Sequence, residues 1–185
     1  MPRNQPLHKA ELPAYHAAAR GLLANRFGVK IYSLSIGPAH GGRSRTRLAK
    51  LEECCDLNRP RSRKTIRNLE KYILVQLAGE VGRVIRIETN MGWNGPCAGQ
   101  VRYAGNCWNR IKNCGQRDVD RAFALIVGWL GRVDDGDPNV TLERLWKQAN
   151  RLLRTNESRS QMDSLAERLK RARKLTGEQV TDLLL

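Results

Sequence analysis

The stretch that decides the fold reads AYHAAARGLL at residues 14–23 and continues as GVKIYSLSI at residues 28–36. Apolar residues recur at helical spacing through the first segment, and Gly28 is typical of a helix C-terminal cap. The second segment is rich in β-branched and aromatic residues that mostly alternate, which predicts a strand. Three consecutive alanines give the helix a thin surface, so we expect another helix to approach it closely.

The best partner for that helix is predicted at residues 65–87, where a continuous apolar stripe follows helical spacing. The stripe consists of Ile66, Leu69, Ile73, Leu77, Val81 and Val84. Small residues interrupt it at Ala78, Gly79 and Gly82, which favours close contact with the alanine-rich helix. Glu80 and Arg83 are three residues apart, so their side chains can attract each other on one helix face.

The chain of 185 residues is long enough for one domain with a sizeable core. We predict a flexible basic leader at residues 1–10 and a single, mainly helical domain at residues 11–185, with a short strand or small sheet after the first helix. No apolar run is long enough for a membrane helix, so no membrane association is expected. Self-association into a homo-oligomer is left open.

The five cysteines indicate a reducing compartment, because their odd number and the absence of an apolar export signal argue against a disulfide framework. We therefore predict a cytoplasmic location. Cys97, Cys107 and Cys114 are an alternative metal-binding set, but their spacing matches no zinc pattern. They lie in segment 88–116, which is rich in Gly and Asn and is either a functional loop or a small cluster around its own Trp residues.

The formal net charge of +15 points to an anionic partner, either a nucleic acid or an acidic protein. Basic residues are densest around one short helix predicted within residues 37–64. The candidate anion-binding or nucleic-acid-binding residues are Arg43, Arg45, Arg47, Arg59, Arg61, Arg63 and Lys64. They form either a solvated pair of loops or a phosphate-binding patch, since guanidinium groups match phosphate oxygens. No aromatic residues interleave with these arginines, so stacking on bases is not indicated.

Four segments resemble, in order and spacing, the peptidase domain of FtsH-type ATP-dependent zinc proteases. They span residues 14–42, 73–85, 118–122 and 165–184, and they contain AYH, LAGEVGRVI, DVDRA and LTGEQV. The resemblance implies a helical peptidase-like fold in which His16 begins a His-Glu-x-x-His helix and Asp118 is the third zinc ligand. Members of that family usually carry a membrane tether and an ATPase, but this chain has no phosphate-loop motif. We therefore expect no ATPase module here.

The chain departs from this family at the two positions that carry its chemistry. Ala17 stands where the family has the glutamate that acts as general base toward metal-bound water. Arg20 stands where the family has the second histidine, and a guanidinium offers no lone pair to a metal and stays charged. The sequence therefore predicts a catalytically degenerate domain that binds or regulates through a basic surface, with no cofactor and with His16 and Asp118 as vestigial metal positions.

Two other interpretations stay open. The chain can be an active zinc metalloprotease with an unusual metal site, built from His16, Asp118 and either His40 or a cysteine. That site would need Glu80 or Glu88 as a replacement base within about 3 Å of the water. Alternatively, the charge can mark a nucleic-acid-binding protein of any fold.

The remaining expectations concern helix ends. Taken alone, Asp118 reads as the N-cap of a helix that begins at Val119. The last third of the chain is predicted to be helical, with a cap at Ser160 and Asp163 and a capping box formed by Thr176 and Gln179.

Overall fold

A computed structural model describes residues 11–37, 43–56, 58–59, 62–90, 116–130 and 136–185. Its helices are α1 (Glu11–Arg26), α2 (Leu51–Cys54), α3 (Arg63–Asn90), α5 (Gln116–Leu125), the π-helix η1 (Ile126–Leu130), α6 (Pro138–Leu153), α7 (Asn156–Ala172) and α8 (Gly177–Asp182). Its strands are β1 (Ile31–Ile36), β2 (Ser44–Leu48) and β3 (Lys174–Thr176). The prediction of a mainly helical fold with a small sheet after the first helix is confirmed.

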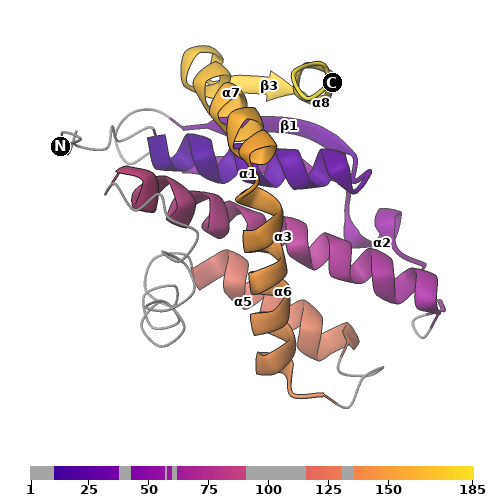
Figure 1. Cartoon of the computed structure of the whole chain (residues 1–185). Coiled ribbons are helices and arrows are strands. Elements are labelled where there is room, and N and C mark those ends of the chain that lie inside the picture. Colours follow the sequence, from indigo (N-terminus) through magenta and orange to yellow (C-terminus); the bar gives the residue numbers. More distant parts are fainter. Residues whose placement is uncertain (1–10, 38–42, 57, 60–61, 91–115, 131–135) are drawn as a thin grey trace.

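Helices α1 and α3 form the centre of the molecule and lie side by side (Figure 1). The predicted close approach is confirmed, because glycines of α3 face the alanine-rich surface of α1. A Cβ atom on Gly82 would lie 2.5 Å from the Ala19 Cβ and 2.9 Å from the Tyr15 carbonyl oxygen. Ala17, Ala18 and Ala19 are fully buried. The small residues therefore set the distance between the two helices.

The sheet covers α1 on another side, with strand order β2-β1-β3 and antiparallel pairing throughout. The strand predicted within residues 28–36 is confirmed as β1, and Gly28 ends α1 with a positive φ of 69°. Leu34 of β1 is fully buried, and its side chain fills the space left by Gly21 of α1. Strands β2 and β3 were not individually predicted, because both are short and one is largely charged.

The C-terminal helices complete the core, with α6 packed against α3 and α7 packed against α1 (Figure 1). The Tyr15 hydroxyl donates a hydrogen bond to Asp163 and so ties α1 to α7. The predicted cap at Ser160 and Asp163 is wrong, because Thr155 caps α7 and these two residues lie inside the helix. The predicted capping box of Thr176 and Gln179 is confirmed at α8.

Asp118 is likewise not an N-cap, since α5 begins at Gln116 and Asp118 lies in its first turn. A carboxylate there still faces the positive end of the helix dipole.

The predicted leader at residues 1–10 lies outside the described residues, as does most of segment 88–116. Among the described helices, none combines the length and the apolar character that crossing a membrane requires.

The glycine contact between α1 and α3 can be tested by substitution. Gly82→Ala should lower the free energy of unfolding by about 1–3 kcal/mol, because the added methyl group meets backbone. On helix propensity alone, the same change would stabilise by up to about 1 kcal/mol. Urea denaturation measures the difference. Gly128→Ala is the matched control, since its Cβ would contact nothing within 4 Å. Equal effects of the two changes would contradict the packing described.

Candidate functional site

Helix α1 presents His16 and Arg20, one turn apart, to the face of α3 that carries Gln76 and Glu80. Gly79 of α3 makes room for the imidazole, because a Cβ atom there would lie 2.4 Å from His16 Nε2. Asp118 reaches the same point from α5. Residues from three helices that are distant in sequence thus meet between α1 and α3.

Both ring nitrogens of His16 have partners. Nε2 lies 2.8 Å from Asp118 Oδ2, and Nδ1 lies 2.7 Å from the Ser44 hydroxyl of β2. Because an ionised carboxylate only accepts hydrogen bonds, Nε2 carries the proton and donates it to Asp118. Nε2 is also 3.5 Å from Glu80 Oε1. With only 12% of its side chain exposed, the imidazole is fixed in orientation by strand and helix together.

Arg20 is the other cation of this cluster and is only 9% exposed. Its Nη2 donates a 2.6 Å hydrogen bond to Gln76 Oε1, and its Nη1 lies 3.6 Å from Asp118 Oδ2. Its Nε is buried and has no hydrogen-bond partner in the described part of the chain. Burial lowers the pKa of the guanidinium, while Asp118 opposes that shift. A guanidinium nevertheless keeps its charge in proteins.

Asp118 is the anion that both cations share. Burial by itself would raise the pKa of this carboxyl group. The hydrogen bond from His16 and the charges of Arg20, His16 and Arg121 act the other way, and the pKa ends below its ordinary value of 3.8. The carboxylate is therefore ionised at neutral pH and neutralises part of the buried positive charge. The second acid, Glu80, is held by Arg83, whose Nη1 lies 3.1 Å from both of its carboxylate oxygens.

We name His16, Arg20, Gln76, Glu80 and Asp118 the inner cluster. Three of its members, His16, Glu80 and Asp118, offer metal-ligand atoms that all lie within 4.8 Å of one another. One imidazole and two carboxylates can in principle chelate a divalent cation. One feature counts against catalytic zinc: the guanidinium of Arg20 lies 3.6 Å from Asp118. A dication placed there would face a buried like charge.

The structure separates the other residues considered for metal chemistry. Ala17 is fully buried, and its methyl group cannot take a proton from water. Glu88 is buried as well and forms a salt bridge with Arg154, the C-cap residue of α6, away from the inner cluster. Glu80 is therefore the only one of the two proposed replacement bases that lies beside His16. His40, Cys97, Cys107 and Cys114 lie outside the described residues.

The predicted basic residues fall into two groups that adjoin α2. Arg43, Arg45 and Arg47 are exposed on or just before β2, an edge strand of the sheet. Arg59, Arg63 and Lys64 are exposed before and at the start of α3, and Arg61 lies outside the described residues. In the described chain, none of these six side chains forms a salt bridge, whereas Arg26, Arg83, Arg86, Arg144 and Arg154 all do.

A cavity of about 480 Å³ lies between β2, α2 and the part of α3 that carries Tyr72 and Gln76. The lining includes five cations, namely Arg20, Arg45, Arg47, Lys50 and Arg121, together with one acid, Glu53. Tyr32, Thr46, Tyr72 and Gln76 also line it. We call it the cationic pocket.

Sequence reasoning missed Ser44, Gln76 and Arg121, although two of them left a signal. Gln76 is a lone polar residue inside an apolar helical run, and a buried amide needs a hydrogen-bond partner. Arg121 follows Asp118 by three residues, so both lie on one helix face. Ser44 gave no signal, because its contact with His16 depends on the pairing of β2 with β1.

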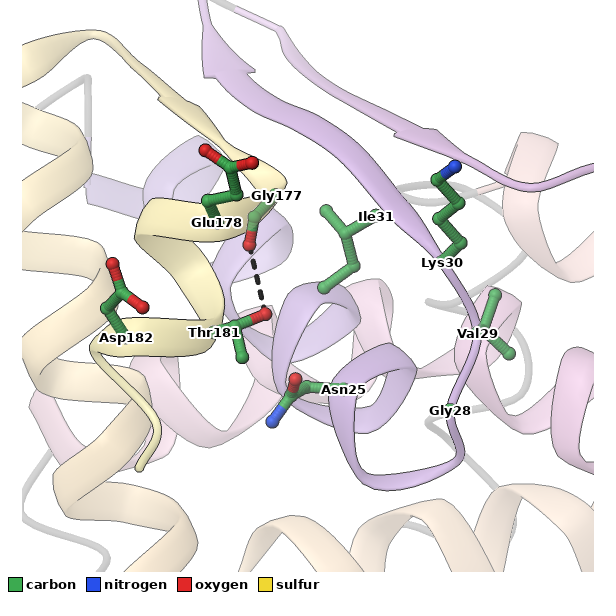
Figure 2. A pocket seen from close by; sticks show the side chains of 9 residues that line it. All are labelled: Asn25, Gly28, Val29, Lys30, Ile31, Gly177, Glu178, Thr181 and Asp182. Carbon is green, nitrogen blue, oxygen red and sulfur yellow. Dashed lines mark hydrogen bonds between the residues drawn. The ribbon is translucent and has the colours of Figure 1, made fainter.

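A second hollow, of about 420 Å³, lies where α8 meets the start of β1 (Figure 2). Its polar lining is mixed, with Lys30 on one side and Glu178 and Asp182 on the other. The Thr181 hydroxyl is already bonded to the Gly177 carbonyl oxygen at 3.1 Å. No buried, unsatisfied side-chain atom of the described residues belongs to its lining. This hollow offers no concentrated charge to a ligand.

Comparison with models of known protein families finds no match to the chain, and comparison with curated proteins finds none either.

The lowered pKa of Asp118 has a testable consequence. Since the folded pKa lies below the ordinary value of 3.8, Asp118 stabilises the fold fully above about pH 4 and loses that contribution as pH falls through its folded pKa. The difference in unfolding free energy between the native chain and Asp118→Asn should therefore shrink between pH 6 and about pH 2. Denaturant unfolding at several pH values measures it.

Asp182→Asn is the control for that measurement, because Asp182 is exposed and forms no salt bridge with a described residue. A constant difference for Asp118→Asn across this pH range would show that the carboxylate is not stabilised by its neighbours.

Proposed function

We propose that this chain is a catalytically degenerate relative of FtsH-type peptidase domains, which binds a polyanionic partner instead of hydrolysing peptide bonds. The observation that carries the proposal is the position of Arg20. Its buried guanidinium lies 3.6 Å from Asp118, at the place where the resemblance puts a zinc-binding histidine. The positive charge beside Asp118 thus comes from the Arg20 side chain, whereas in a zinc hydrolase it comes from the metal ion.

The relationship to the peptidase family is supported by the meeting of His16 and Asp118. These residues are 102 positions apart, and the resemblance assigns both to one metal site. Their side chains lie within hydrogen-bond distance. The order of the elements that hold them, with a strand directly after the first helix, also agrees with the resemblance.

The binding role is supported by the arginines beside α2 that form no salt bridge with a described residue. Arg43, Arg45 and Arg47 are exposed and alternate with the less exposed Ser44 and Thr46, so the three guanidinium groups extend from one side of β2 and the residue before it. Strand β2 runs into α2, which contacts the start of α3 where Arg63 and Lys64 lie. Five of the six described cations are arginines, which bind phosphate bidentately. A nucleic-acid backbone is therefore the proposed partner. A cytoplasmic location is proposed from the odd number of cysteines.

The absence of zinc chemistry can be tested by rebuilding the missing ligand. Purified native protein should hold no stoichiometric zinc by elemental analysis after dialysis against a zinc buffer. Arg20→His removes the buried cation and places an imidazole at i+4 from His16, so this variant should gain about one zinc per chain. Arg20→Gln is the control, because it removes the charge without adding a strong ligand and should bind none.

Stoichiometric zinc in the native protein that disappears in His16→Ala would overturn the non-catalytic reading and favour a metalloprotease with Glu80 as its base.

The nucleic-acid interface can be tested by salt-dependent titration of a short DNA duplex and a matched RNA duplex. The logarithm of the affinity should fall linearly with the logarithm of salt concentration. Changing Arg43, Arg45 and Arg47 together to Gln should reduce the slope for DNA by about 2–3, since each phosphate contact contributes about 0.9. Changing Arg151, Arg168 and Arg171 to Gln is the charge-matched control, as these residues are exposed on α6 and α7 and form no salt bridge within the described part of the chain.

Equal losses in both triple variants would show that net charge alone drives binding. Tight, salt-independent binding, or binding of an acidic polypeptide such as polyglutamate but of neither duplex, would replace the nucleic-acid partner with another.

A further inference from the structure

We propose that the cationic pocket is a specific site for a small phosphate-bearing molecule, which shares Arg45 and Arg47 with the nucleic-acid interface proposed on β2. This inference does not depend on nucleic-acid binding. It stands on three observations: the charge of the lining, the engagement of its single acid, and buried polar atoms without partners.

Cationic side chains are concentrated around one surface hollow. Five cationic side chains and one carboxylate line a cavity of about 480 Å³. This volume falls within the range of small-molecule sites, about 300–1,000 Å³. A hollow whose charged lining is mostly of one sign focuses the electrostatic potential and attracts counter-ions. On the core side, Tyr72 is 4% exposed and Gln76 is 1% exposed, so this wall is fixed by packing.

The one acid of the lining does not neutralise these cations. Glu53 accepts a 2.9 Å hydrogen bond from the Tyr32 hydroxyl and a 3.0 Å bond from the Lys50 backbone N–H. None of the lining cations is within salt-bridge distance of it. Only Arg20 has an acidic partner among the described residues, and Arg20 shares that partner, Asp118, with His16. Within the described residues, no salt bridge involves Arg45, Arg47, Lys50 or Arg121.

Two polar atoms of the lining residues are buried without partners in the described chain, the Thr46 hydroxyl and Arg20 Nε. An unsatisfied buried donor costs about 1–3 kcal/mol. Phosphate oxygens that reach the inner end of the pocket, with a small shift of the flexible side chains around it, would accept from both groups. The chemistry thus selects a tetrahedral oxyanion with several acceptors over a single carboxylate. The remaining volume leaves room for an organic part beside Tyr32.

Inorganic pyrophosphate is the probe for this site, titrated calorimetrically at constant ionic strength with sodium chloride as the balancing salt. One saturable site per chain is expected. Arg121→Gln should weaken binding at least tenfold. Thr46→Val should weaken it several-fold without lowering the melting temperature, because it removes a hydroxyl that is unsatisfied in the free protein.

Arg43→Gln and Arg63→Gln are the controls, since both residues are basic and exposed but do not line the cavity, and each should change the affinity less than twofold. The absence of saturable binding, or equal losses in lining and control variants, would overturn the site.

A competition arm separates a free phosphate compound from a phosphate of the bound nucleic acid. Pyrophosphate at saturation should weaken the binding of a DNA duplex, because Arg45 and Arg47 belong to both sites. Thr46→Val should weaken pyrophosphate binding but leave the affinity for the duplex within twofold. If Thr46→Val weakens DNA binding as much as pyrophosphate binding, the pocket is part of the nucleic-acid interface and the small-molecule site is overturned. A pocket that binds pyrophosphate while the duplexes fail to bind would instead refute only the proposed nucleic-acid function.

Discussion

The close approach of α1 to α3 is the constraint on which the rest of the structure depends. Gly79 and Gly82 face α1, and any side chain at either position would collide with His16 or with the backbone at Tyr15. With the helices this close, side chains between them lose contact with water. Every polar group that α1 and α3 turn toward each other must therefore find a protein partner.

This requirement explains the composition of the inner cluster. A buried guanidinium is expensive unless it is paired and hydrogen-bonded, and Arg20 has both an anion, Asp118, and an amide, Gln76. His16 shares the same anion through Nε2 and is oriented by Ser44 through Nδ1. The cluster links α1, α3, α5 and β2 by side-chain hydrogen bonds and ion pairs. On the proposal made here, it keeps the architecture of a metal site while an arginine supplies the positive charge.

Much of this arrangement follows from local patterns in the sequence. The packing of α1 against α3 was predicted from the alanine run in α1 and from Ala78, Gly79 and Gly82 in the apolar stripe of α3. Small residues on two facing helices allow their backbones to approach closely, and residue size can be read directly from the sequence. The pairing of Glu80 with Arg83 followed from helical spacing alone. The short strands β2 and β3 could not be predicted individually, since their pairing with β1 is a long-range contact with no local signature. For the same reason, the contact of Ser44 with His16 and the cationic pocket behind it were not visible in the sequence.

The state of the His16 imidazole tests the central claim most directly. Nitrogen-15 NMR of the ring, recorded at neutral pH before and after one equivalent of zinc, reports which nitrogen carries a proton and whether either binds a metal. We expect a protonated Nε2, held by Asp118, whose signal zinc leaves unchanged. An Nε2 that loses its proton and shifts to the position of a metal-bound nitrogen would show that zinc, and not Arg20, completes this site.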